Sequence, residues 1–197
     1  MTGLRSAHRS RDYWDEVYAD HTSTPAPLLP GERHLFADRT GAAPGQTVVD
    51  IGCGLGLWTA TLAASGMLAT GYDCSPVAVA RARELHPPAR YGRLAFEVCD
   101  IDVDQDLAAL RPGSVDLVTL RHVLPLLDPR IITDIRRWLR PDGVLHVTTR
   151  VSGSYLVQMT AEAIRGVGSG WRSATHYRVT QDSSTLGIVL QGPRGTT

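Results

Sequence analysis

The sequence predicts an α/β fold built on a doubly wound, mostly parallel sheet. Apolar runs of strand length alternate with helix-like stretches through the middle of the chain, and the first runs end in acidic or glycine residues. The clearest run is TVVDIGCGLG at Thr47–Gly56, in which Val48, Val49 and Ile51 suit a central parallel strand. Glycines just past such a strand let the backbone turn sharply and approach a ligand that a Cβ would block. A nucleotide-like cofactor site is therefore expected at this turn.

The spacing of the glycines distinguishes between cofactors. A dinucleotide fingerprint, G-x-G-x-x-G, would place its third glycine at Leu57. The sequence instead reads D-x-G-x-G-x-G, with Asp50 followed by Gly52, Gly54 and Gly56. This pattern resembles the first motif of the class I S-adenosylmethionine-dependent methyltransferases. The resemblance implies that the carboxylate and the glycine backbone receive the methionine part of the cofactor.

The next elements follow at the intervals that a βα unit requires. A helix is expected at Leu57–Ser65, closed by Gly66, and a strand at Leu68–Tyr72 that ends at Asp73. An acidic residue roughly 20 positions beyond a glycine loop is where this architecture places a carboxylate for ribose hydroxyls. Asp73 is therefore expected to bind the ribose.

A second unit leads to the expected adenine site. Ser75, followed by proline, is the expected N-cap of a helix that stops at His86-Pro87-Pro88. The third strand is expected at Leu94–Cys99. The resemblance assigns Asp100 to the adenine amino group and Ile101 to packing on the ring.

The resemblance covers roughly residues 45–150 and completes the fold prediction. It predicts a Rossmann-like, seven-stranded sheet with helices on both faces and the last strand antiparallel. The remaining elements are expected as a strand at Val115–Leu120, a helix at Pro129–Leu139, a turn at Leu139–Gly143, a strand at Val144–Thr149, a helix at Ser154–Arg165 and a closing antiparallel pair at His176–Thr180 and Gly187–Gln191. A further short helix is expected at Leu107–Leu110.

Residues 1–44 are expected to form a helical lid on a core at 45–197, with a single domain overall. In this lid Trp14 and Tyr18 lie one helical turn apart, with Tyr13 beside them. Tyr13 and Tyr18 are the preferred contacts near the methionine end, where a sulfonium gains from an aromatic face. The alternative is that these rings only anchor the helix.

A proline-rich linker follows the first helix of the lid. It spans Thr24–Pro30, reads TPAPLLP and cannot continue a helix. A second helix is expected at Glu32–Thr40, and a hinge in the linker would allow the lid to move.

The loop after the fourth strand contains the candidate catalytic group. His122 is the first candidate for a general base, because the ordinary histidine pKa of about 6.5 lies near working pH. The alternative is a packing or backbone contact with the cofactor. Arg121 could pair with a carboxylate of the cofactor or of a substrate, or could be a solvated charge at the strand end.

The composition of the chain bears on its ligands and its location in the cell. The net charge is zero and the arginines form no dense cluster, which argues against nucleic-acid binding. The chain has no membrane span or export signal by sequence, so a cytoplasmic location is expected. Cys53, Cys74 and Cys99 lack metal-ligand spacing, so no metal is expected, and packing is favoured over thiol reactivity.

The resemblance implies an enzyme that transfers the methyl group of S-adenosylmethionine to a small molecule, natural products included, and releases S-adenosylhomocysteine. Two alternatives stay open: a fold that binds this cofactor for cyclisation or rearrangement, and a non-catalytic partner protein that binds it. The residues expected to bind the cofactor are Tyr13, Tyr18, Asp50, Gly52, Cys53, Gly54, Gly56, Asp73, Cys74, Asp100, Ile101 and Arg121.

Overall fold

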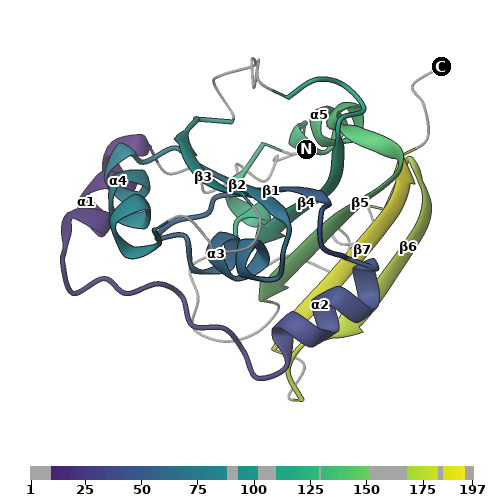
Figure 1. Cartoon of the computed structure of the whole chain (residues 1–197), viewed down its shortest axis with the longest axis horizontal. Coiled ribbons are helices and arrows are strands. Elements are labelled where there is room, and N and C mark those ends of the chain that lie inside the picture. Colours follow the sequence, from purple (N-terminus) through teal and green to yellow (C-terminus); the bar gives the residue numbers. More distant parts are fainter. Residues whose placement is uncertain are drawn as a thin grey trace, which may run out of the picture.

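The computed structural model describes residues 10–87, 93–101, 110–128, 130–150, 168–181 and 184–193. Within these ranges seven strands form one sheet in the order β3-β2-β1-β4-β5-β7-β6 (Figure 1). The strands are β1 (Thr47–Ile51), β2 (Leu68–Asp73), β3 (Arg93–Val98), β4 (Val115–Arg121), β5 (Leu139–Arg150), β6 (Trp171–Arg178) and β7 (Thr185–Pro193). The helices are α1 (Arg11–Ala19), α2 (Glu32–Thr40), α3 (Leu57–Ala64), α4 (Pro76–Leu85) and α5 (Ile131–Trp138), with a short 3-10 helix η1 (Leu124–Leu126).

The strand order confirms the doubly wound architecture. β1 pairs in parallel with both β2 and β4, so the chain reverses its direction of travel across the sheet between these two neighbours. β3 and β5 extend the parallel part on either side. β7 is antiparallel to both β5 and β6, as predicted for the last strand. The switch point beside β1 is where ligands bind in open α/β sheets.

Two apolar layers cover the sheet. On one face, Phe36 of α2 and Leu62 of α3 pack with Val48 and Leu117 of the sheet. On the other face α5 packs, through Ile135 and its neighbours, against the alternate strand residues. Because successive strand side chains point to opposite faces, a strand covered on both sides is apolar throughout, which explains the continuous apolar runs in the sequence.

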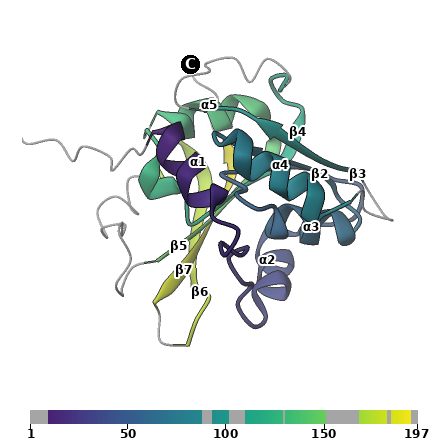
Figure 2. The ribbon, with the colours of Figure 1, turned by 90° about the vertical axis from the view of Figure 1, so that its left-hand side faces the viewer.

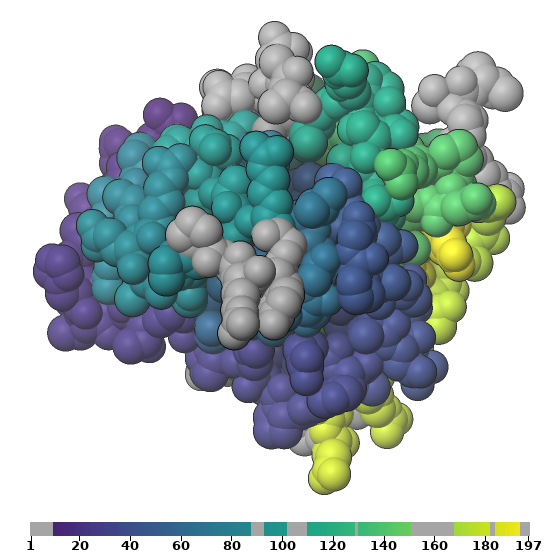
Figure 3. Space-filling view, viewed as in Figure 1, coloured from purple at the N-terminus to yellow at the C-terminus, as the bar shows by residue number. Residues whose placement is uncertain are grey.

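Serine residues cap the N-termini of α1 and α4. Ser75 Oγ accepts from the backbone N–H of Ala78 at 3.0 Å, so the predicted start of α4 is confirmed. Ser10 Oγ accepts from the N–H of Tyr13 at 3.3 Å at the start of α1. Figures 1 and 2 place α1 beside α4. In Figure 3 the purple N-terminal residues lie along the left and lower rim of the molecule, next to teal α4.

The starts of two strands, β5 and β6, differ from the sequence prediction. The expected turn at Leu139–Gly143 is part of β5, because Leu139 pairs with Val115 and Val144 with Leu117, so the residues between them form a bulge. β6 begins at Trp171, ahead of the expected start at His176, because its pairing with β7 extends to Pro193. The expected helices at Ser154–Arg165 and Leu107–Leu110 lie outside the described residues. In the described part of the chain, every helix is too short or too polar to cross a membrane.

Candidate functional site

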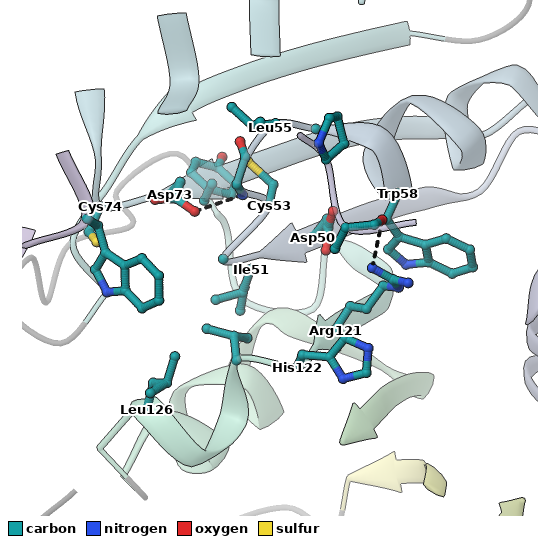
Figure 4. A pocket seen from close by; sticks show the side chains of 18 of the residues that line it. Asp50, Ile51, Cys53, Leu55, Trp58, Asp73, Cys74, Arg121, His122 and Leu126 are labelled. Atoms are coloured by element: carbon teal, nitrogen blue, oxygen red, sulfur yellow. Dashed lines mark hydrogen bonds between the residues drawn. The ribbon is translucent and has the colours of Figure 1, made fainter. Parts of the chain in front are cut away.

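A cavity of about 550 Å³ lies where the parallel strands end, between the glycine turn after β1 and the loop after β4. Every residue that the sequence analysis assigned to the site lines this cavity. Figure 4 shows Asp73 and Cys74 on one side of it and Arg121 and His122 on the other, with Asp50 between them. The structure therefore brings the predicted residues together, while their individual roles stay predictions.

The glycine turn is held by the neighbouring strand. The backbone N–H groups of Gly52 and Cys53 both donate to the carbonyl of Tyr72, at 2.8 and 3.0 Å. Gly54 has a φ of 52°, and a Cβ there would lie 2.8 Å from the hydroxyl of Tyr18. The glycine thus admits both the left-handed turn and the close approach of α1.

Asp73 connects the glycine turn to α4. Its Oδ2 accepts from the N–H of Gly54 at 2.8 Å and its Oδ1 from the N–H of Ser75 at 3.0 Å. Burial raises the pKa of this carboxyl, while the two N–H donors pull the pKa in the other direction. Each carboxylate oxygen can accept a further hydrogen bond, so Asp73 can still receive hydroxyls from a ligand.

Asp50 is more deeply buried, with 1% of its surface exposed. Thr59 Oγ1 donates to its Oδ2 at 2.6 Å. Burial raises the pKa of Asp50 to about 7, which the Thr59 hydrogen bond and the nearby Arg121 only partly oppose. A buried carboxylate of this kind gains most from a cationic ligand group, because the opposite charge restores the ionised form.

The third expected contact region lies after β3. Asp100 and Ile101 both line the cavity, and Ile101 also packs against the main apolar cluster. The backbone N–H of Cys99 donates to the carbonyl of Asp73 at 2.9 Å, which fixes this strand end beside the ribose candidate. A carboxylate next to an apolar side chain suits a planar ring that carries a polar edge.

The cysteines at the cavity are not activated. Burial raises the pKa of Cys53 well above its ordinary value, and the nearby Asp73 and Asp50 add to this effect. Burial and Asp73 raise the pKa of Cys74 to about 12. Both thiols therefore stay protonated at neutral pH, which favours packing over nucleophilic chemistry.

Arg121 forms an ion pair that the sequence analysis missed. Its Nε donates to Glu32 Oε1 at 2.8 Å and one terminal nitrogen donates to Glu32 Oε2 at 3.1 Å. The side chains are 9% and 2% exposed, so the pair is buried. The arginine lines the cavity with its charge balanced by the chain's own carboxylate, and it is not a solvated charge.

His122 has a backbone conformation that is rare for a residue with a side chain. Its φ is 64°, and its backbone N–H donates to the carbonyl of Thr148 at 2.8 Å. Within the described part of the chain its Nδ1 is buried without a hydrogen-bond partner. Burial, with Arg121 and Arg150 nearby, lowers the pKa of His122 to about 4. The imidazole is therefore neutral at pH 7 and able to accept a proton, but it is a weaker base than the ordinary histidine on which the expectation rested.

The aromatic residues of α1 cover the opposite side of the cavity. The rings of Trp14 and Tyr18 stack with centroids 5.9 Å apart, and Tyr13 meets Trp14 edge to face at 5.2 Å. All three rings line the cavity. Burial raises the pKa of the Tyr18 hydroxyl, as does the charge of Asp73, so Tyr18 is present as the neutral phenol. Both readings of this helix, cofactor contact and anchor, are compatible with this arrangement.

Several cavity residues escaped the sequence analysis. They carry no motif, because their positions depend on contacts between segments distant in the sequence. Trp58 lies in the first turn of α3 and lines the cavity. Thr59 and Glu32 support the lining from behind, because Thr59 donates to Asp50 and Glu32 pairs with Arg121. The further lining residues are Trp14, Thr24, Pro25, Ala26, Pro27, Leu29, Ile51, Leu55, Leu57, Tyr72, Cys99, Val123, Pro125, Leu126, Leu127, Thr149 and Arg150.

The donor set fits S-adenosylmethionine. Buried Asp50 suits the cationic methionine end, Asp73 suits paired hydroxyls, and Asp100 with Ile101 suits an amino-substituted ring.

Comparisons with known proteins agree with this geometry. A family model described as a methyltransferase domain matches residues 49–147. The ubiquinone biosynthesis O-methyltransferase of Xanthomonas campestris is 34% identical over 139 residues, which is 70% of this chain and 55% of that protein. The chain thus spans about half the length of the curated relatives it matches.

Solved structures share the fold. A chain from the complex between the Haloferax volcanii Trm112 methyltransferase activator and a methyltransferase superposes with a TM-score of 0.70 and 22% identity, over 95% of this chain and 99% of that one. Haemonchus contortus phosphoethanolamine N-methyltransferase 2, in complex with S-adenosylmethionine, gives a TM-score of 0.66 and 18% identity, over 92% of this chain and 56% of that one.

Proposed function

We propose, because the chain belongs to the class I S-adenosylmethionine-dependent methyltransferase family, that this protein binds S-adenosylmethionine and transfers its methyl group to a small-molecule acceptor. The observation that carries the proposal is the cavity at the switch point of the sheet, which gathers the glycine turn and the carboxylates at the ends of β1, β2 and β3.

The bound cofactor supplies an electrophilic methyl group on a sulfonium. The chain's own residues hold and orient it. Asp50 and the backbone of the glycine turn take the methionine part, Asp73 the ribose hydroxyls, and Asp100 with Ile101 the adenine. Holding two reactants in line and excluding water supplies much of the rate in such a displacement.

The other end of the cavity suits the acceptor. The neutral imidazole of His122 is proposed to remove a proton from a hydroxyl acceptor, with the ring oriented by its fixed backbone at the end of β4. Burial of this ring, more than the charges of Arg121 and Arg150, disfavours a positive charge here, so an acid or a phenol suits the site better than an ammonium group. The relatives named as O-methyltransferases support the same choice.

The activity is tested with S-adenosylmethionine that carries a labelled methyl group and a panel of phenols, carboxylic acids and amines. The expected result is S-adenosylhomocysteine formation with label transfer to a phenol or an acid by the native chain. Transfer to a phenol should be at least about 100-fold slower in His122→Ala at neutral pH, whereas transfer to a carboxylic acid, which is already ionised at that pH, should not depend on His122. Binding of the cofactor without transfer to any class would contradict the proposed enzyme and favour the non-catalytic alternative.

A further inference from the structure

The segment between α1 and α2, residues 20–31, forms part of the cavity wall, and we call it the strap. Thr24, Pro25, Ala26, Pro27 and Leu29 of the strap all line the cavity. The strap contains neither helix nor strand, so repetitive backbone hydrogen bonding does not hold it in place. Its position depends on side chains of the sheet and of α4.

Arg121 of β4 fixes the end of the strap that leads into α2. Besides the buried pair with Glu32, its terminal nitrogens donate to the carbonyl of Pro27 at 2.6 Å and of Ala26 at 3.3 Å. Glu32 Oε2 in turn accepts from the N–H of Leu29 at 2.8 Å. Separating this pair would leave two charges in a buried site, which is costly. This end of the strap is therefore the fixed end.

Arg81 of α4 holds the end that leads out of α1. Its Nη1 donates to the carbonyl of Tyr18 at 2.7 Å and to that of Asp20 at 3.0 Å, and its Nη2 donates to that of Ser23 at 3.0 Å. These contacts are partly exposed and include no buried carboxylate, so water can replace them at lower cost than at Arg121. No residue of α1 is fully buried, but Tyr13, Trp14, Val17 and Tyr18 are half-buried, so the helix is retained by partial burial as well as by these polar contacts.

Release of the Arg81 end would uncover the glycine turn. The Tyr18 hydroxyl lies against Gly54, and the Tyr18 carbonyl is one of the three groups that Arg81 holds. α1 is also attached through Asp15, whose Oδ1 accepts from Ser75 Oγ at 2.5 Å and from the N–H of Val77 at 3.4 Å. These polar attachments all run to α4 or to its N-cap Ser75, so they can separate together and carry the Tyr18 ring away from Gly54.

We propose that the strap is hinged at the Arg121–Glu32 pair and opens at Arg81, which makes Arg81 a positioning residue for ligand access to the Gly54–Asp73 side of the cavity. Arg81 acts through the backbone of Tyr18, Asp20 and Ser23 and need not touch the ligand. The identity of the ligand, S-adenosylmethionine or S-adenosylhomocysteine, rests on the proposed function. The hinge itself rests on the contacts of the strap.

The hinge is tested by amide hydrogen exchange of the full chain without ligand, with Arg81→Ala compared with Arg83→Ala. Arg83 lies on the same helix, but it donates to the carbonyl of Phe96 and pairs with Glu97, away from the strap. In Arg81→Ala, exchange of the amides at 13–24 should rise about tenfold, with β1 and α2 unchanged. Arg83→Ala should leave 13–24 as in the native chain.

A second measurement follows S-adenosylhomocysteine binding by stopped-flow tryptophan fluorescence, since Trp14 and Trp58 line the cavity. Arg81→Ala should raise the dissociation rate about tenfold, and Arg81→Lys should recover part of the native rate. A merely structural role for Arg81 would lower the melting temperature without this selective change in rate.

Equal exchange at 13–24 in the two alanine variants would overturn the hinge, as would faster exchange confined to Ala26–Leu29. The exchange measurement needs no ligand, so it judges the hinge even if the native chain binds neither cofactor form. Absence of binding by the native chain would instead overturn the proposed function. The two failures are therefore distinguishable.

Discussion

At the scale of single residues, burial shifts the ionisable groups of the cavity in opposite directions. Asp50 has a raised pKa and His122 a lowered one, so both groups favour their neutral forms in the ligand-free protein. The sequence predicted both residues as site residues, but it does not show how deeply their side chains are buried. The partner of Arg121 was equally hidden, because Glu32 lies 89 positions away in the chain.

Asp73 is expected to contribute directly to cofactor affinity. Asp73→Ala should weaken S-adenosylhomocysteine binding by about 1.5–3 kcal/mol, the usual effect of losing hydrogen bonds to a charged group. The measurement is calorimetric titration well below the melting temperature of the variant, because the Gly54 and Ser75 contacts are also lost. Asp38→Ala, an exposed carboxylate on α2, is the control. An unchanged affinity in Asp73→Ala would rule out the ribose assignment.

His122 should set the acidic limit of activity. A base with a pKa of about 4 in the folded protein stays unprotonated down to that pH. The rate kcat/KM for a hydroxyl acceptor should therefore stay flat from pH 8 to about 5 and fall near pH 4, well below the ordinary histidine value of about 6.5. A decline centred near 6.5, or a rate unchanged in His122→Ala, would contradict the assigned role.

Asp50 should make the ligand-free protein less stable as the pH rises. Its folded pKa of about 7 lies above the ordinary value of about 3.9, so the folded chain binds the proton more tightly. The stabilising effect is complete below about pH 4 and declines until the pH passes 7. Between pH 5 and pH 8, the free energy of unfolding of Asp50→Asn, measured in urea, should rise by roughly 2.5 kcal/mol relative to that of the native chain. A constant difference between the two proteins would mean that Asp50 ionises normally.

At the scale of elements, the ends of the strands carry the site, and the sequence predicted most of them. The apolar run that contains Asp50 predicts a strand clearly, because β1 is central and covered on both faces, whereas the strand before Asp100 lies at the edge of the sheet and is partly exposed. The bulge at Arg140–Gly143 was missed, since turn residues also suit an irregular strand. The early start of β6 was missed because Arg172–His176 is exposed and lacks an apolar pattern.

The contact between the glycine turn and α1 yields a prediction at this scale. Gly54→Ala places a Cβ 2.8 Å from the Tyr18 hydroxyl and forces a side chain into a left-handed conformation, at about 1–2 kcal/mol for the backbone alone. Gly113→Ala has a similar φ of 67° with open space around it, so it measures the backbone cost alone.

The expected result is a larger loss of S-adenosylhomocysteine affinity and of stability in Gly54→Ala than in Gly113→Ala. Adding Tyr18→Phe should recover part of the loss, with a coupling of about 0.5 kcal/mol or more in a double-mutant cycle. Additive effects of the two substitutions would mean that Tyr18 and Gly54 do not contact each other in solution.

At the scale of the whole molecule, sheet order and cavity position follow from the parallel strands, so the sequence could predict them together. The attachment of the lid could not be predicted in this way. Arg81 reaches Tyr18 across 63 positions and Arg121 reaches Glu32 across 89, and neither pair has a local pattern. Roles that depend on such distant contacts become visible only in the folded chain.

The central claim is that this cavity binds S-adenosylmethionine, and calorimetric titration tests it most directly. S-adenosylmethionine, S-adenosylhomocysteine and a nicotinamide dinucleotide are titrated in parallel into the full chain. We expect saturable binding of the first two with one site per chain, and no heat from the dinucleotide. Binding of the dinucleotide alone, or of none of the three, would contradict it.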